Sequence, residues 1–405
     1  MKKSLLITVF ISSTSFSLPS HAYKHSNILD NSHVINSISL NNFKSTKNNS
    51  ILIANNLNLG GLEGSGGSGS GGSGSGGLGS GGSDSSGSGS GGLGSGGSGS
   101  SGSGSGGSGS SGLGSGGSGS SGSNYSGQNL KKSDLKKANL KKANFKKADL
   151  TGATLKEADL KQANLSGAKL KNADLTKAKL KKAILKSSNL KDAKLIRADL
   201  TDAQLNYAVL EKANLRNSKL RKANLNDTKL KGANLTNAKL KKATLVNASL
   251  KKAKLRRADL TKANLTNADL LRANLSSANL EEANLYKASL ISAKLRKADL
   301  TNAYLKNADL KKANLNSAVL SGANLRNTNF FGADLTRANL SNADLTGSNL
   351  SNSDLSYANL KNANLSKANL SGANLYGLSG TKLASCPNLL PEEWQCTSEK
   401  YLLKL

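Results

Sequence analysis

The sequence predicts an all-β solenoid, and three observations carry that prediction. A leucine stands at every fifth position from Leu130 to Leu375, fifty positions in all, with Phe145 and Phe330 as the two replacements. After Gln128, which opens the array, the residue two places before each leucine is small and is nearly always alanine. The residue between them is most often Asn or Asp. A repeat period of this kind decides the fold class before individual propensities do.

A period of five fits neither an α-helix nor a flat strand. Five residues advance about 500° around a helix, so successive leucines would step about 140° and form no apolar stripe. In a flat strand the side-chain period is two, so alternate leucines would lie on opposite faces. A chain that turns a corner every five residues can direct every leucine, and the small residue two places before it, toward one axis. The remaining three positions of each repeat are then expected to point outward.

The repeated blocks, such as Ala138-Asn139-Leu140 and Ala173-Asp174-Leu175, resemble the A-(D/N)-L-x-x motif of pentapeptide-repeat proteins. The resemblance covers residues 128–375. It implies a right-handed quadrilateral β-helix in which four pentapeptides make one coil. The array would then form about twelve coils, stacked into a rod roughly 60 Å long at the usual inter-strand spacing. An interior filled in this way has no room for a ligand.

Residues 1–22 are typical of a secretory signal peptide. Lys2 and Lys3 form a positive start, an apolar run from Leu5 to Ile11 follows, and Ser20-His21-Ala22 offers small residues at a cleavage site. The alternative, a membrane span, is disfavoured because so short an apolar run cannot cross a bilayer. We therefore expect an exported protein, either periplasmic or extracellular.

Two low-complexity segments separate the signal from the array. Residues 23–59 are polar and are expected to be mostly disordered, with the alternative that Ile51-Leu52-Ile53 adds a strand to the first coil. Residues 60–127 are almost entirely Gly and Ser, a composition that cannot bury a core and behaves as a flexible linker. The glycines follow no strand and precede no helix, so a phosphate-binding loop is not expected.

Residues 376–405 end the repeat and are predicted to cap the solenoid. The segment from Leu390-Pro391 to Trp394 resembles a tail that accompanies bacterial pentapeptide arrays. A solenoid end needs a cap, because it exposes unpaired backbone and a slice of core. In an exported protein the two cysteines, Cys386 and Cys396, are expected to form a disulfide. A metal site would need more ligands than two cysteines provide.

Catalytic chemistry has no candidate residues in this sequence. The histidines, His21, His25 and His33, all precede the linker, and Glu281-Glu282 is the only adjacent pair of acidic residues in the array. Neither a nucleophile with its base, nor a set of metal ligands, nor a cofactor loop can be assembled from these residues. The sequence therefore predicts a protein that is not an enzyme and binds no cofactor or metal.

Positive charge is the one feature that points to a partner. The formal net charge is +31, and residues 131–260 carry 35 Lys and Arg against 11 Asp and Glu. If residues twenty apart stack on successive coils, nine basic residues share one face, interrupted at Thr201-Asp202, and form a stripe about 25–30 Å long. These residues are Lys141, Lys142, Lys161, Lys181, Lys182, Arg221, Lys222, Lys241 and Lys242.

Three functions follow from these observations as alternatives. The first is an exported binding or scaffold protein whose basic face contacts an anionic polysaccharide, lipopolysaccharide, teichoic acid or another polyanion. Sequence-specific recognition of nucleic acid is not expected, because the outward tyrosines are too sparse to stack on bases. The second is a structural spacer or surface component whose lysines only keep it soluble. The third, a topoisomerase-binding mimic of DNA, is implied by the resemblance but requires negative charge. The sequence does not indicate the oligomeric state.

Overall fold

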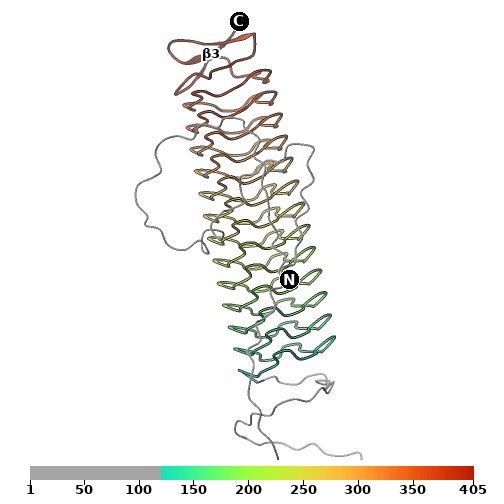
Figure 1. The fold of residues 1–405 in the computed structure, drawn as a ribbon. Coiled ribbons are helices and arrows are strands. Elements are labelled where there is room, and N and C mark those ends of the chain that lie inside the picture. Colours follow the sequence, from blue (N-terminus) through green and yellow to red (C-terminus); the bar gives the residue numbers. More distant parts are fainter. Residues whose placement is uncertain (1–119) are drawn as a thin grey trace, which may run out of the picture. The chain divides into compact units, whose positions relative to one another are not determined.

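The computed structural model describes residues 120–405, which are coloured in Figure 1. The signal peptide at 1–22, the polar segment at 23–59 and most of the linker at 60–127 lie outside the described residues. Within the described part, coil stacks on coil from the first repeats to the C-terminal end (Figure 1). Residues 120–405 contain no helix long and apolar enough to cross a membrane.

Parallel bridges between residues twenty positions apart hold the coils together. They begin with Asn124 and Asn144 and continue along the array to Asp354 and Asn374. In each repeat the bridging residue is the middle one of the small-polar-leucine block, and one turn of the coil takes four repeats. The expectation that residues twenty apart stack on one face is therefore confirmed.

The core is the column of leucines and small residues along the axis. Central leucines such as Leu225 are 0% exposed, and so are Phe145 and Phe330, which take leucine positions. The alanines two places before them are equally buried. Each buried leucine side chain is worth roughly 1.5–3 kcal/mol before conformational entropy is subtracted. The prediction of inward leucines and alanines is confirmed.

Each corner of the coil is a hydrogen-bonded turn. The carbonyl of Leu140 accepts a hydrogen bond from the N–H of Ala143 at 3.2 Å, and the second corner residue, Lys142, has φ of 56°. A positive φ at this place is the signature of a type II turn. The left-handed conformation costs a non-glycine residue on the order of 1 kcal/mol. Backbone hydrogen bonds between successive coils, which form a ladder along the array, offset this cost. The N–H of Lys142, for example, donates to the carbonyl of Lys161 on the next coil at 2.8 Å.

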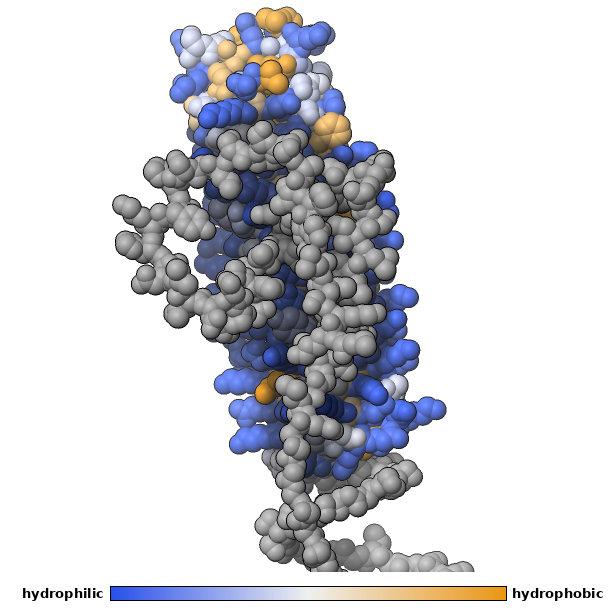
Figure 2. All heavy atoms as spheres, viewed as in Figure 1, coloured by the Kyte–Doolittle hydropathy of each residue, from blue (hydrophilic) through white to orange (hydrophobic). Residues whose placement is uncertain are grey.

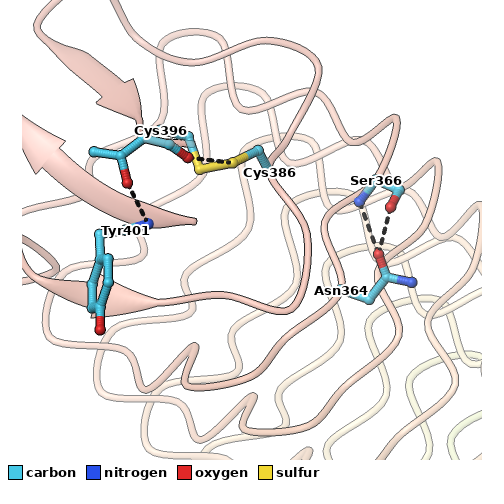
Figure 3. Close-up of a disulfide and its surroundings, with 6 residues drawn as sticks. Asn364, Ser366, Cys386, Cys396 and Tyr401 are labelled. Atoms are coloured by element: carbon cyan, nitrogen blue, oxygen red, sulfur yellow. Dashed lines mark hydrogen bonds between the residues drawn. A yellow bond between two sulfur atoms is a disulfide. The ribbon is translucent and has the colours of Figure 1, made fainter. Parts of the chain in front are cut away.

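The Asn or Asp in each block braces the corner that follows it. The Oδ1 atom of Asn144 accepts a hydrogen bond from the N–H of Lys146 at 3.1 Å. In many repeats where Ser or Thr follows the leucine, its hydroxyl also donates a hydrogen bond to this oxygen, as Ser366 does to Asn364 (Figure 3). The expectation that this residue simply points outward is therefore incomplete. Its side chain turns back to the backbone, an Asx turn, and most of these residues are half-buried.

The β-helix begins before residue 128, so the predicted end of the linker at 127 is wrong. Asn124 already bridges Asn144, and Tyr125 takes a leucine position with its ring stacked 4.7 Å from that of Phe145. Gly122 and Gly127 occupy second corner positions with φ of 81° and 69°. Serine and glycine suit these corners, and they hid the first turns of the solenoid within a Gly/Ser-rich composition.

The C-terminal segment extends the ladder and then closes it. Ser385 bridges Asn364 and Leu389 bridges Asn369, so residues predicted to be a separate cap also add backbone to two faces. Three short strands follow the array: β1 (Thr381–Lys382), β2 (Trp394–Cys396) and β3 (Tyr401–Lys404). They form an antiparallel sheet in the order β1-β3-β2 at the end of the column (Figure 1).

A basic corner of the β-helix as the candidate binding surface

The nine predicted basic residues lie on one corner of the coil, which we call the basic corner. Lys141, Lys142, Lys161, Lys181, Lys182, Arg221, Lys222, Lys241 and Lys242 are all exposed. Ladder hydrogen bonds fix their order, for example from the N–H of Lys142 to the carbonyl of Lys161 and from the N–H of Lys222 to the carbonyl of Lys241. The structure therefore brings all nine together on one edge of successive coils. Where the array is visible in Figure 2, most of its surface side chains are hydrophilic.

The first part of the basic corner encloses a shallow hollow of about 450 Å³. Five lysines line it, and no carboxylate is among the lining residues. The lining consists of Ser121, Lys141, Lys142, Lys161, Gln162, Lys181 and Lys182. Long side chains that fan out from stacked corners leave room between them, and the space is bordered by ammonium groups.

Thr201 and Asp202 interrupt the basic corner, as the sequence predicts, and both are half-buried. Beyond them lies a second hollow of about 320 Å³, in which Lys181, Arg221 and Lys241 are joined by two more lysines, Lys219 and Lys239. Its lining also contains Asp199, Thr201 and Asp259. This hollow is therefore less uniformly positive than the first. Lys222 and Lys242 are on the same corner but line neither hollow.

Most cations of the basic corner have no acidic partner. Asp159 lies 3.8 Å from the ammonium of Lys141 and 3.7 Å from that of Lys161. Within residues 120–405, no carboxylate oxygen lies within 4.0 Å of a charged nitrogen of the other seven. Exposed pairs of this kind contribute little to stability. Seven cations thus remain available for an external anion.

The two faces beside the basic corner differ. One carries Lys179, Lys219 and Lys239 among aspartates, and these three exposed lysines widen the positive region. The other carries the uncharged residues Asn164, Ile184, Gln204, Asn224 and Thr244. The sequence reasoning missed the three extra lysines, although the same twenty-residue spacing would have found them.

Elsewhere on the array, single aspartates are held in their ionised form. Burial raises the pKa of Asp149, but the hydrogen bonds from Thr151 and the charges of Lys131 and Lys169 outweigh it and leave that pKa below its ordinary value. The pKa of Asp174 is lowered in the same way by Thr176 and Lys156 against the effect of burial. These carboxylates are local partners of neighbouring lysines and do not line the two hollows of the basic corner.

The two cysteines are at the other end of the molecule from the first coils. Cys386 and Cys396 are joined by a disulfide, with their Cα atoms 5.9 Å apart (Figure 3). In the part of the chain that the structure describes, no three His, Cys, Asp or Glu side chains are placed to hold a metal ion.

A family model described as pentapeptide repeats matches most of this array. The matched residues are 121–156, 153–192, 198–237, 233–272, 268–307, 308–347 and 343–377. No curated protein matches the chain.

Solved structures of pentapeptide repeat proteins also match. HetL of the cyanobacterium Nostoc sp. strain PCC 7120, described as involved in the regulation of heterocyst differentiation, is 39% identical. The match covers 54% of this chain and 89% of HetL, with a TM-score of 0.20. Rfr23 of the cyanobacterium Cyanothece 51142 is 30% identical over 27% of this chain and 64% of its own, with a TM-score of 0.19. QnrB1, a plasmid-mediated fluoroquinolone resistance protein, is 20% identical over 44% of this chain and 85% of its own, with a TM-score of 0.29. The chain belongs to the pentapeptide-repeat family, whose members fold as right-handed β-helices and are generally structural or binding proteins.

Proposed function

We propose that this protein is an exported, non-enzymatic binding or scaffold protein that contacts an anionic polymer at the cell envelope or outside the cell. In this proposal a flexible Gly/Ser-rich linker carries a β-helix of about twelve coils, and the basic corner is the surface that meets the polymer. The partner classes are acidic polysaccharide, lipopolysaccharide or another polyanion.

One observation carries the proposal: seven cations of the basic corner have no carboxylate within ion-pair distance. Lysines that serve only solubility need no alignment. Here they are stacked on one edge, at the spacing of about 4.8 Å between coils. A linear polyanion that follows this edge would meet several cations at once and would release its condensed counterions. The first hollow has no carboxylate in its lining, and three of its lysines, Lys142, Lys181 and Lys182, are among the seven cations without an acidic partner.

The opposite role, a mimic of DNA, is not supported by this surface. A protein that replaces DNA on an enzyme must display negative charge along its length. The formal net charge of this chain is +31, and its densest row of charged groups is positive. The remaining alternative is a structural spacer, and binding measurements separate it from the proposal.

The test measures the affinity of the full chain for three polymers as salt rises from low to physiological concentration. The polymers are polygalacturonate, lipopolysaccharide and a random-sequence DNA duplex. We expect the logarithm of the binding constant to fall linearly with the logarithm of the salt concentration. In a variant with six charges of the basic corner reversed, affinity should fall by at least about a hundredfold and the slope should become shallower. The reversed residues are Lys181, Lys182, Arg221, Lys222, Lys241 and Lys242, each changed to Glu.

The control reverses six exposed lysines that lie on other corners. It has the same net charge as the first variant, so it separates the arrangement of charge from its amount. The control residues are Lys136, Lys137, Lys171, Lys212, Lys231 and Lys252, all exposed. We expect the control to weaken binding by much less. Equal losses in the two variants, or no binding to any of the three polymers at low salt, would exclude the basic corner as a polymer site and leave the spacer role.

A further inference from the structure

A third hollow, of about 560 Å³, lies on the corner that precedes the basic corner along each coil. It is built from three successive rungs of that corner: Arg256-Arg257, then Ser276-Ser277, then Arg296-Lys297. Ladder hydrogen bonds from the N–H of Arg257 to the carbonyl of Ser276, and from the N–H of Ser277 to the carbonyl of Arg296, fix this order. We call it the arginine hollow, and its lining residues are Arg256, Asn274, Ser276, Ser277, Lys294, Arg296, Lys297 and Asn314.

The serine rung is what makes the hollow. Coils are about 4.8 Å apart, so the two long basic rungs are separated by about 10 Å. Between them Ser276 and Ser277 have short side chains, and the guanidinium groups of Arg256 and Arg296 therefore border a gap. The hollow of about 560 Å³ is larger than a phosphate or sulfate group alone, so it leaves room for the organic part of an ester whose charged group lies on the serine rung between two cations.

All the charged groups around the gap are cationic, and none of the lining residues is acidic. The Oδ1 atom of Asn274 is occupied, because it accepts hydrogen bonds from the N–H of Ser276 at 3.1 Å and from its hydroxyl at 2.8 Å. The amide nitrogen of Asn274 is thus the group left to donate. The other flanking amide, Asn314, donates instead to Asp334 at 2.9 Å.

The cations of the arginine hollow are unpaired. Among residues 120–405, no carboxylate lies within 4.0 Å of the charged nitrogens of Arg256, Lys294, Arg296 or Lys297. Arginine also differs from the lysines of the basic corner in what it recognises. A guanidinium offers a planar fork of donors that fits an oxyanion bidentately, whereas an ammonium acts as a point charge.

We propose that the arginine hollow is a discrete site for a tetrahedral oxyanion, namely a phosphate or sulfate monoester. Arg256 and Arg296 hold the non-bridging, anionic oxygens from two sides, and Lys294 and Lys297 add charge at the rim. The amide of Asn274 and the hydroxyl of Ser277 donate from the serine rung. The site is independent of the proposed function, because a small oxyanion can occupy it whether or not a polymer binds the basic corner.

Calorimetric titration of the full chain at low salt tests the site with small ligands. Inorganic phosphate and sulfate represent the free ions, glucose 6-phosphate and glucose 6-sulfate represent the esters, and glucuronate represents a planar carboxylate. We expect saturable binding of the esters with one site per chain, and weaker binding of glucuronate, because a carboxylate offers two acceptor oxygens to the two arginines whereas the ester group offers three. Tighter binding of the free ions than of the esters would assign the site to free oxyanions and overturn its assignment to an ester.

The decisive variant keeps the positive charge at both positions but replaces each guanidinium group with an ammonium group. In the double variant R256K/R296K, glucose 6-phosphate should bind about tenfold more weakly, although the net charge is unchanged. The matched control is R197K/R216K, which changes two exposed arginines of the same corner that do not line the hollow. Ester affinity should be unchanged in this control. At physiological salt, where screening acts over about 8 Å, it should also be nearly unchanged when the six charges of the basic corner are reversed. Equal binding by the native chain and R256K/R296K, or no saturable ester binding at all, would overturn the proposal.

Discussion

The residue two places before each leucine, usually alanine, shows how closely single residues are matched to the core. Where serine or threonine replaces alanine, its hydroxyl is buried and usually donates to a nearby carbonyl. Ser188 donates to the carbonyl of Leu185 at 2.7 Å, and Thr228 donates to that of Leu225 at the same distance. The hydroxyls of Ser218 and Ser348 are equally buried, but neither has a hydrogen-bond partner in the described structure. An unpaired buried hydroxyl costs about 1–3 kcal/mol.

This difference predicts opposite effects for one substitution at two equivalent positions. Ser218→Ala should raise the free energy of unfolding by about 1 kcal/mol, because it removes an unpaired buried polar group. Ser188→Ala should lower it by about 0.5–1 kcal/mol, because it removes a hydrogen bond that is made. Denaturant unfolding of both variants beside the native chain measures the difference. A loss of stability in both would mean that the hydroxyl of Ser218 has a partner, such as a water molecule.

At the scale of elements, the C-terminal segment acts as a lid on the last coil. Leu378, Leu383 and Leu402 are buried, and Trp394 packs against the same core. The disulfide ties the segment before β2 to β2 itself. Leu389 and Leu405 remain 50% and 73% exposed, and Figure 2 shows the hydrophobic side chains gathered at this end.

Loss of the Cys386–Cys396 disulfide should loosen this lid without unfolding the array. The bond closes a loop of ten residues, so in the loop-entropy model it contributes about 2–3 kcal/mol. We expect Cys386→Ala/Cys396→Ala to lower the stability of the last coils and to leave the central coils unchanged. Proteolysis followed by mass spectrometry should show new cleavage near residues 376–405 only. Cleavage spread evenly over the array would contradict a local role for the disulfide.

Much of this architecture could be predicted from the sequence, because a leucine at every fifth residue can be buried in a common core by few backbone arrangements. The twenty-residue stacking that aligns Lys142 with Lys182 came from the family resemblance, and the parallel bridges confirm it. The bracing role of Asn144 could not be predicted, because it depends on the direction in which a side chain turns at a corner. The start of the solenoid could not be predicted from the leucine periodicity, because Tyr125 occupies a leucine position.

The candidate sites were only partly predictable for a related reason. Charge counted along the chain separates residues 131–260 from the rest, and this boundary divides the arginine hollow between Arg257 and Ser276. Counted along a column of residues twenty apart, the same charges form two groups on neighbouring corners. Stacking makes residues that are distant in the sequence neighbours in space. The net charge summed over a stretch of sequence therefore does not reveal a site that spans several coils.

At the scale of the whole molecule, stability comes from contacts between neighbouring coils. Within residues 120–405 an interior coil has a partner on both sides, whereas the first of these coils has a partner on one side only. Exposure follows this pattern: Leu130 is 5% exposed and Ala138 is 4% exposed, while Leu225 is 0% exposed. At the far end the capping segment covers most of the last coil, although Ala373 is still 6% exposed.

The described part of the molecule should therefore unfold from its ends, and more readily from the end at residue 120, where the described residues include no capping segment. We expect amide hydrogen exchange to be fastest at residues 120–140, intermediate at residues 360–377 and slowest near the centre of the array, because local opening needs less free energy where fewer coil contacts break. Reducing the disulfide should accelerate exchange at residues 360–377 and leave residues 120–140 unchanged. One common exchange rate along the whole array would contradict the nearest-neighbour account. It would mean that the coils unfold as a single unit, with the ends no weaker than the middle.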